Sequence, residues 1–351
     1  MDVRAGEHVA LLRHHAAEPG ARLELPPATY QLVARDEENE AHLRNNPRPP
    51  RSYGFACGLS DAEMRAAYYA WKPQWRLGNG PLKIAAGVTL MGREGVALAD
   101  RRDAGDRLIK VETEGVRFES LRFAMGVDIA SGGSATMTGC ESTGRTIRVE
   151  KGASLAMEDC RVFANKASYR KVFRSAGGGV WSGGKLEAKN CKFESIAGNG
   201  IEVKGEQALG QLVDCVMRNN TTGLWSNTNV TAMRCTMENG TGRFGHGVFM
   251  EGKAAVELVD CTIRDNAKAG ALVYDAGSKL TLRGGRVSGN KVAGVAALDG
   301  GTVVVAAAEE GRHQTVSEGH PKKGNWVDQF NAGPAGQIEG LAARTVTQLT
   351  E

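Results

Sequence analysis

Residues 155–162, LAMEDCRV, hold the pattern that decides the fold. Apolar residues stand at the first, third and eighth places, and a cysteine stands at the sixth. Five further copies keep the cysteine, and two copies carry another residue in its place. The equivalent positions are Leu121, Cys140, Cys160, Cys191, Cys215, Cys235, Cys261 and Gly285, in steps of 19 to 31 residues. Self-similarity at this spacing indicates one structural unit that is repeated about eight times.

The apolar positions alternate with the two-residue period of a β-strand and not with the 3.6-residue period of a helix. An Asn recurs five residues after the cysteine position, at Asn165, Asn220, Asn266 and Asn290, with Asn239 one place early. Asn tolerates left-handed backbone geometry and can bond within its own loop, so we interpret it as a turn residue. A unit this small cannot bury its own apolar face. Successive units must therefore stack as coils of a parallel β-solenoid.

Several short segments resemble a known β-helix superfamily. Residues 87–92 (GVTLMG), 108–111 (LIKV) and 115–118 (GVRF) resemble the opening coils of the right-handed parallel β-helix in pectate-lyase-like and polygalacturonase-like proteins. Residues 23–30 (LELPPATY) resemble its first strand and turn. The resemblance runs from about residue 21 to 305. It implies an all-β, right-handed parallel β-helix of about 8 to 10 coils, but its motifs specify architecture and not activity.

The chain is expected to have three parts. An N-terminal cap at 1–82 contains the first strand, helices at 7–16 and 64–71 and an exposed, charged and Pro-rich loop at 35–52. The β-helix occupies 83–308. A C-terminal cap at 309–351 holds a last irregular coil and a polar tail from 344. Caps are expected because the open ends of a solenoid expose unpaired strand edges.

The six repeat cysteines share one inward register, and Cys57 lies apart from them. Side chains in register on neighbouring coils are about 4.8 Å apart, whereas disulfide Cβ atoms are about 3.8 Å apart. We therefore expect buried, reduced thiols. The chain has no C-x-x-C pair and no interleaved His, so no metal site is expected here. Reduced thiols and the lack of a signal peptide favour a cytoplasmic or otherwise intracellular protein.

The composition argues against two classes of binding partner, nucleic acids and membranes. Lys and Arg number 44 and Asp and Glu number 40, giving a formal charge of only +4, so nothing global indicates nucleic acid. No apolar run approaches the length of a membrane-spanning helix, and we expect a soluble chain without a membrane partner.

One outward stripe carries aromatic residues. If Val180, Leu224 and Val248 point inward, the residues that follow them point outward, because strand neighbours alternate faces. These residues are Trp181, Trp225 and Phe249, and Glu202 takes the same register on the coil between the two tryptophans. Three aromatic side chains in register form a flat apolar platform that suits sugar rings. The alternative is that a loop folds over them.

Two coils are lengthened between the Asn turn and the Gly that restarts the next strand, so both insertions are expected on one flank. The first insertion combines basic and aromatic residues, which can hold an acidic polymer. Its candidate residues are Tyr169, Arg170, Lys171 and Arg174. A solvated loop with chance charge is the alternative. Past the second insertion, acidic residues recur at similar register, at Glu251, Asp275 and Asp299. Their carboxylate oxygens could bind Ca²⁺, and the alternative is that they are ordinary turn residues.

The second insertion contains Arg243 and His246. Residues 245–247, GHG, resemble a motif of polygalacturonase-type hydrolases. Such hydrolases need clustered aspartates to protonate the leaving oxygen and to activate water, and this chain has no Asp-Asp pair. We therefore expect His246 to be an exposed turn residue, with a ligand-contacting or catalytic role as the alternative.

Three functions remain open from the sequence. The first is a β-helix binding module that recognises an extended, acidic polysaccharide along the aromatic stripe. The alternative is a polysaccharide-active enzyme, such as a uronate lyase, epimerase or glycoside hydrolase. Its candidate catalytic residues are His246, Arg243, Arg170 and Tyr169. The second alternative is an intracellular scaffold that binds a protein partner.

Overall fold

The computed structural model describes residues 16–25, 29–31, 82–92, 96–99, 107–143, 146–163 and 179–306, and four short strands beyond 306. The expected cap helices lie outside these residues, apart from Ala16, and so does the loop at 35–52. All regular elements in the described part of the chain are β-strands. Among these residues, no helix has the length and apolar character needed to cross a bilayer.

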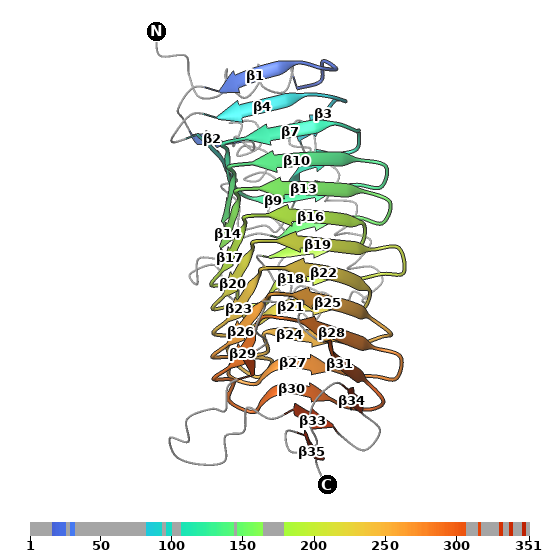
Figure 1. Cartoon of the computed structure of the whole chain (residues 1–351). Helices are drawn as coiled ribbons and strands as arrows, with labels where there is room; N and C mark the ends of the chain where they lie inside the picture. Colours follow the sequence, from blue (N-terminus) through green and yellow to red (C-terminus); the bar gives the residue numbers. More distant parts are fainter. Residues whose placement is uncertain are drawn as a thin grey trace, which may run out of the picture.

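The strands form three parallel sheets that run the length of a rod (Figure 1). Each coil contributes one strand to sheet A, then one to sheet B, then one to sheet C, except that the last coil has no described strand in sheet B; neighbours in a sheet therefore come from successive coils. The sheets have 12, 11 and 12 strands.

Sheet A contains β1 (Arg22–Leu25), β4 (Thr89–Gly92), β7 (Val116–Glu119), β10 (Ser134–Thr138), β13 (Ser154–Glu158), β16 (Lys185–Lys189), β19 (Leu209–Val213), β22 (Asn229–Met233), β25 (Ala255–Val259), β28 (Lys279–Arg283), β31 (Thr302–Ala306) and β34 (Gln337–Glu339). Sheet B contains β2 (Thr29–Gln31), β5 (Ala97–Ala99), β8 (Arg122–Ala124), β11 (Glu141–Thr143), β14 (Arg161–Phe163), β17 (Lys192–Glu194), β20 (Val216–Arg218), β23 (Thr236–Glu238), β26 (Thr262–Arg264), β29 (Arg286–Ser288) and β32 (Thr315–Val316). Sheet C contains β3 (Leu82–Ile84), β6 (Arg107–Val111), β9 (Gly126–Ile129), β12 (Ile147–Val149), β15 (Val180–Ser182), β18 (Asn199–Val203), β21 (Thr222–Ser226), β24 (Val248–Met250), β27 (Ala269–Val273), β30 (Ala293–Ala297), β33 (Phe330–Ala332) and β35 (Val346–Gln348).

The predicted fold is confirmed: the chain is an all-β parallel solenoid. Alternate residues of all three sheets point inward and join one continuous apolar core. Phe118 of sheet A and Phe123 of sheet B, for example, meet edge to face with ring centroids 5.3 Å apart. The strands β32 to β35 continue the sheets beyond residue 308, and β35 lies where the sequence indicated a polar tail.

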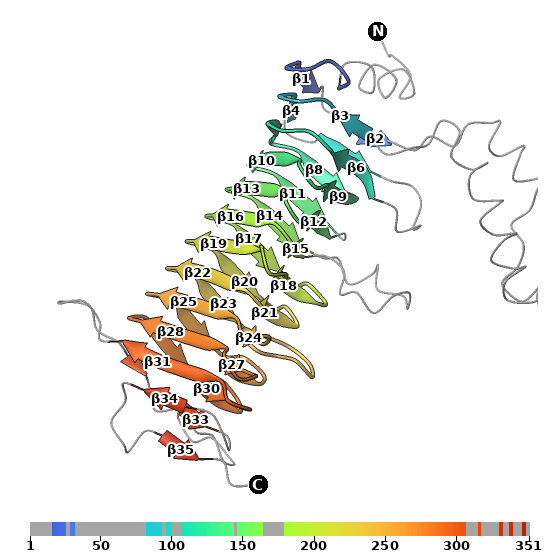
Figure 2. The same cartoon turned by 90° about the vertical axis from the view of Figure 1, so that its right-hand side faces the viewer.

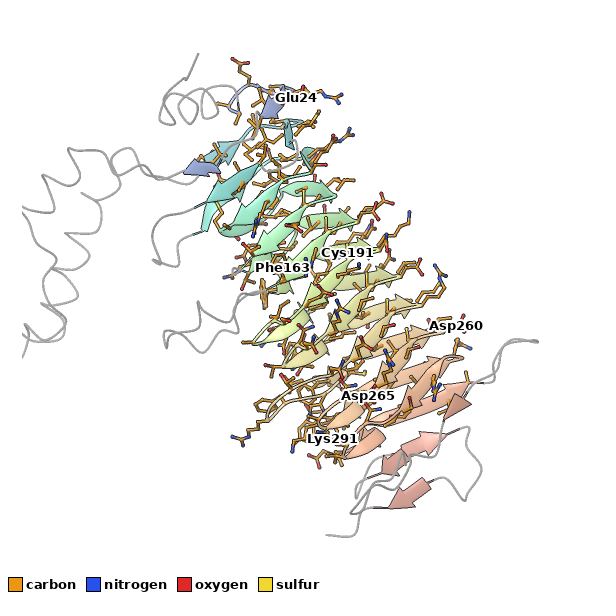
Figure 3. All side chains as sticks on the ribbon, turned by 90° about the vertical axis from the view of Figure 1, so that its left-hand side faces the viewer. Glu24, Phe163, Cys191, Asp260, Asp265 and Lys291 are labelled. Atoms are coloured by element: carbon orange, nitrogen blue, oxygen red, sulfur yellow. The ribbon has the colours of Figure 1, made fainter. Side chains whose placement is uncertain are left out.

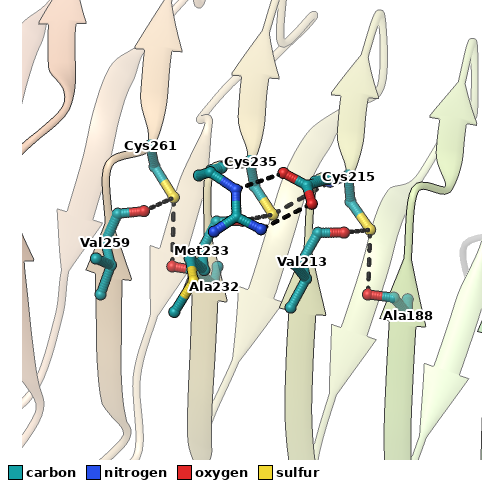
Figure 4. Close-up of polar contacts among 10 residues, drawn as sticks. Ala188, Val213, Cys215, Ala232, Met233, Cys235, Val259 and Cys261 are labelled. Atoms are coloured by element: carbon teal, nitrogen blue, oxygen red, sulfur yellow. Dashed lines mark hydrogen bonds and ion pairs between the residues drawn. The ribbon is translucent and has the colours of Figure 1, made fainter.

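The corner between sheets A and B is built from a left-handed residue followed by a buried cysteine. Asp214, for example, has a φ of 54° and directly precedes Cys215. The Cys215 thiol donates to the carbonyl oxygens of Val213 in its own coil (3.3 Å) and Ala188 in the preceding coil (3.4 Å). Figure 4 shows the thiols of Cys215, Cys235 and Cys261 in neighbouring coils. All six repeat cysteines are buried and form no disulfide.

The corner between sheets B and C corrects the role expected for the recurring Asn. Asn220, Asn266 and Asn290 are buried, and the left-handed φ belongs to the residue before each of them. The Asn266 side chain accepts a hydrogen bond from the Gly240 N–H (2.8 Å) and donates one to Met237 O (3.2 Å). The Asn side chains therefore bond the preceding coil and not their own loop. Asn239, one place early, takes the left-handed position itself, with a φ of 55°.

Ion pairs between neighbouring strands cover the outer faces of sheets A and B. On sheet B, the Glu194 carboxylate is buried and contacts Arg161 (2.9 Å) and Arg218 (2.5 Å). On sheet A, Arg283 contacts Glu257 of the preceding coil at 2.6 Å. These faces thus hold their opposite charges close together.

Candidate functional site

The outer face of sheet C carries the aromatic stripe in the expected register. Trp181 aligns with Glu202, Glu202 with Trp225, and Trp225 with Phe249, on four successive coils. The residues before them in each strand, such as Leu224 and Val248, are fully buried. Figure 2 shows these strands, β15 to β24, stacked one below another. The strand alternation therefore places all four side chains on one outer face.

The stripe is longer than the sequence indicated. Arg148 precedes Trp181 in the column, and Leu272 follows Phe249. Arg148 and Leu272 are half-buried, as are the four residues between them. Three rings, one cation, one carboxylate and one leucine thus follow one another over six coils.

Each ring of the stripe lies against a neighbour from another coil or loop. The Arg148 guanidinium is 4.6 Å from the ring centroid of Trp181, and Lys204 Nζ is 5.1 Å from that of Trp225. The Trp225 and Phe249 rings are 6.5 Å apart and tilted by 39°. Cations at these distances from a ring are attracted to its π face. Each ring thus packs against at least one neighbouring side chain, which favours the orientation seen.

Two features of the chain make room for Trp181 and orient Glu202. A Cβ added to Gly183 would come 3.0 Å from the Trp181 ring, so the indole lies across a residue that has no side chain. The Glu202 carboxylate accepts a hydrogen bond from Asn199 Nδ2 at 3.0 Å. Sequence analysis missed Arg148, Gly183 and Lys204. The only available signal was the register that Arg148 shares with Trp181.

The structure corrects the expectation that His246 is an exposed turn residue. Only 9% of its surface is exposed, and its ring stacks on that of Phe249 with centroids 5.8 Å apart and planes at 23°. Its Nδ1 accepts a hydrogen bond from the Ala269 N–H at 3.3 Å, so the neutral ring carries its proton on Nε2. Burial lowers the pKa of His246 to about 4, and nearby Lys268 acts in the same direction. His246 therefore packs against Phe249 of the stripe as a neutral imidazole.

Arg243 is exposed in the loop that joins β23 to β24, on the flank of sheet C. Its guanidinium lies 5.6 Å from the ring of Phe244, which is 55% exposed. The structure thus brings Arg243 and His246 into one loop. Tyr169, Arg170, Lys171 and Arg174 lie outside the described residues, as does the rest of the insertion that could cover the two tryptophans.

Three acidic residues follow strands of sheet C, on the flank opposite Arg243: Glu251 after β24, Asp275 after β27 and Asp299 after β30. Burial raises the pKa of Glu251, and the charge of Asp275 adds to the effect. The Asp299 carboxylate accepts a hydrogen bond from the Tyr274 hydroxyl, which raises the pKa of Tyr274. Among the residues that the structure describes, no group of three His, Cys, Asp or Glu side chains has an arrangement that could hold a metal ion. The described acids thus supply no complete ligand set for Ca²⁺.

Chemically, the face offers rings for stacking, cations for anionic groups and carboxylate oxygens that accept hydrogen bonds from hydroxyl groups. These are the elements with which proteins bind amphipathic, hydroxyl-rich molecules. Because they repeat once per coil, about every 4.8 Å, they suit a ligand that is itself extended along the rod.

Comparison with known proteins bears on the fold. Residues 171–307 match the family model described as the right handed beta helix region. Among solved structures, the chain is similar to the A-module of the mannuronan C-5 epimerase AlgE6 from Azotobacter vinelandii, with a TM-score of 0.41 and 15% identity over 99% of this chain and 95% of that chain. A search of curated protein sequences finds no significant match. The family match and the three parallel sheets together identify the chain as a right-handed parallel β-helix protein.

Proposed function

We propose that the protein is a binding module for an extended, acidic polysaccharide that lies along the outer face of sheet C. The observation that carries this proposal is the continuous register of Trp181, Glu202, Trp225 and Phe249 on four successive coils. A rigid column of this kind presents a repeating surface to a repeating ligand. It needs no movement of the protein on binding.

Each part of the column has a role in such a complex. The apolar C–H face of a sugar ring packs on an indole or phenyl ring, and the sugar hydroxyls donate to a carboxylate such as that of Glu202. The cations Arg148 and Lys204 hold the two indole rings in place from neighbouring coils. Ring orientation is thereby set before the ligand arrives, which lowers the ordering cost of binding.

The acidic character of the ligand is supported by the flank of the face. Arg243, Lys268 and Lys291 precede three successive sheet C strands, and none forms an ion pair with a described residue. Cations without an acidic partner are free to bind carboxylate or sulfate groups of a polymer.

A polysaccharide-active enzyme is the second candidate. Glu251 favours it, because a carboxyl with a raised pKa beside a stacking platform has the property required of a general acid. Buried His246 favours it less, since Nδ1 is occupied by the Ala269 N–H. A protein-interaction scaffold remains a further hypothesis, with no described contact in its favour.

Tryptophan fluorescence during titration with neutral, uronate and sulfated polysaccharides tests the proposal. Saturable quenching by an acidic polymer, without new ultraviolet absorbance from unsaturated products, supports a binding module. Absorbance that grows with time and disappears in Glu251→Gln or His246→Ala would instead identify a lyase. A lack of response in both channels across the panel would reject both the binding module and a lyase.

A further inference from the structure

Six charged side chains lie at the two ends of three neighbouring strands of sheet C. Each of β24, β27 and β30 has a cation before it and an acid after it. The cations are Arg243, Lys268 and Lys291, and the acids are Glu251, Asp275 and Asp299. None of the six forms an ion pair with a described residue. The cations and the acids therefore form two rows of opposite sign on opposite edges of one face.

This arrangement differs from that of the other two sheets. On sheets A and B, acids and bases stand on neighbouring strands and pair directly, as Glu238 does with Arg264 at 2.5 Å. On the part of sheet C formed by β24, β27 and β30, the length of each strand separates the cation at one end from the acid at the other. One further acid, Asp265, lies at the same lower end of the rod as Lys291, as Figure 3 shows, and its Oδ2 is 4.0 Å from Arg264. Two cations also lie near the acids: Lys204, whose charge lowers the pKa of Glu251, and exposed Lys253, two residues after Glu251.

Like charges that recur on successive coils along each edge repel one another and weaken the isolated chain. A partner relieves this repulsion fully only if it carries both signs, arranged as two rows across an apolar centre. The centre of this face is apolar, because half-buried Phe249 and Leu272 align between the two rows and buried Ala296 continues their column. A polyanion would neutralise the cation row and leave the acid row unpaired.

We propose that the lower half of sheet C, defined by β24, β27 and β30, binds the same face of a second copy of the chain. The two copies are related by a two-fold axis parallel to the rod. That rotation exchanges the two edges of the face and keeps the order of the coils, so each cation row faces the partner's acid row. A two-fold axis in the plane of the face but across the rod would place like charges together. The face is thus self-complementary for one symmetry operation.

The size of the face sets the strength expected of the contact. Three coils cover about 14 Å along the rod, so the buried area is smaller than the roughly 800 Å² per partner of a standard interface. Association is therefore weak, concentration-dependent and sensitive to salt, since the charges at both edges are near solvent. The inference goes beyond the proposed function and does not depend on it. Because the face includes Phe249, a polymer that occupies this part of the stripe would compete with self-association.

Sedimentation equilibrium of the full chain at low and high ionic strength tests the proposal. The wild-type protein is expected to form dimers whose dissociation constant rises with salt. Arg243→Glu and Glu251→Arg each place like charges across the two-fold axis and should raise that constant about tenfold or more. The double variant restores opposite charges and should return it to within about threefold of the wild type.

Lys192→Glu is the matched control, because Lys192 is exposed on sheet B and its reversal changes the net charge equally. It should leave the dimer unchanged. A wild-type chain that stays monomeric at all concentrations would overturn the proposal, and so would a double variant no stronger than the single ones. Trp181→Ala lies outside the three coils and should leave the dimer intact while it weakens polymer binding. The two proposals can therefore fail separately.

Discussion

Asn266 Nδ2 donates a hydrogen bond of 2.8 Å to Asn290 Oδ1, so that two side chains buried in successive coils are joined directly. Asn290 in turn accepts from the backbone N–H of Asn266 and donates to Ile263 O. The turn between sheets B and C is thus bonded from coil to coil by its side chains as well as by its backbone. Because no water reaches these groups, each bond that is lost leaves an unsatisfied polar atom inside the rod.

Asn266→Ala should lower the free energy of unfolding by about 2 to 3 kcal/mol, because it leaves the Gly240 N–H and Met237 O without partners. Urea unfolding followed by circular dichroism measures the effect. Asn229→Ala is the control, since Asn229 is exposed and should change stability little. Equal losses in the two variants would show that the buried hydrogen bonds contribute nothing specific.

Glu194→Ala should destabilise the protein by about 1 to 3 kcal/mol, because it leaves Arg161 and Arg218 facing each other without the carboxylate between them. Both arginines are half exposed, which limits the loss. Glu187→Ala removes a carboxylate that is paired with Lys185 on the solvent side of sheet A, so its effect should be under about 1 kcal/mol. If Glu187→Ala were the more damaging variant in urea unfolding, the ion pairs of sheet B would have no structural role.

His246 should titrate near pH 4, because burial opposes the charged imidazolium. The unfolded chain binds this proton near its ordinary pKa of 6.5, so the unfolded state holds more protons between those values. Stability should therefore rise with pH from about 4 to about 6.5 on account of this residue and stay level above that range. The ring carbon shifts of His246 in an NMR titration measure the midpoint directly. A midpoint near 6.5 would mean that the ring is exposed to water.

The six repeat thiols should be unreactive in the folded protein. All of them are buried, and those of Cys160 and Cys215, for example, donate to backbone carbonyl oxygens. A chromogenic thiol reagent should therefore modify them only at the rate of unfolding, and all should react in denaturant. Rapid modification of several of these thiols in the native protein, with no loss of β-sheet signal, would contradict the packing described for the corner between sheets A and B.

The sequence allowed the fold to be predicted because the solenoid repeats one local rule. A period-two pattern with a cysteine at a constant place specifies which side of each strand faces the core, and stacking follows from it. The register of Trp181 with Glu202 and Trp225 could be predicted for the same reason. It needed only the alternation of strand neighbours and the order of the coils.

Other features of the site depend on side-chain rotamers and on contacts between coils, which the repeat pattern does not specify. His246 was expected to be exposed because the chain lacks the clustered aspartates of the hydrolases, yet its ring is buried and stacks on Phe249. Arg148 and Lys204 carried no motif, and only the structure shows them against the tryptophan rings. The recurring Asn was placed in the correct turn but given the wrong role, because its left-handed neighbour varies between Asn, Asp and Gly.

The affinity of an acidic polysaccharide for the wild-type chain and for the double variant Trp181→Ala, Trp225→Ala tests the central claim most directly. The account predicts that loss of both stacking surfaces raises the dissociation constant by about tenfold or more. Phe163→Ala is the matched control, because Phe163 is an outward ring on sheet B that also lies under a guanidinium, that of Arg161 at 4.4 Å. It should leave the affinity unchanged. Equal affinities for the wild-type chain and the double tryptophan variant would contradict the assignment of sheet C as the binding face.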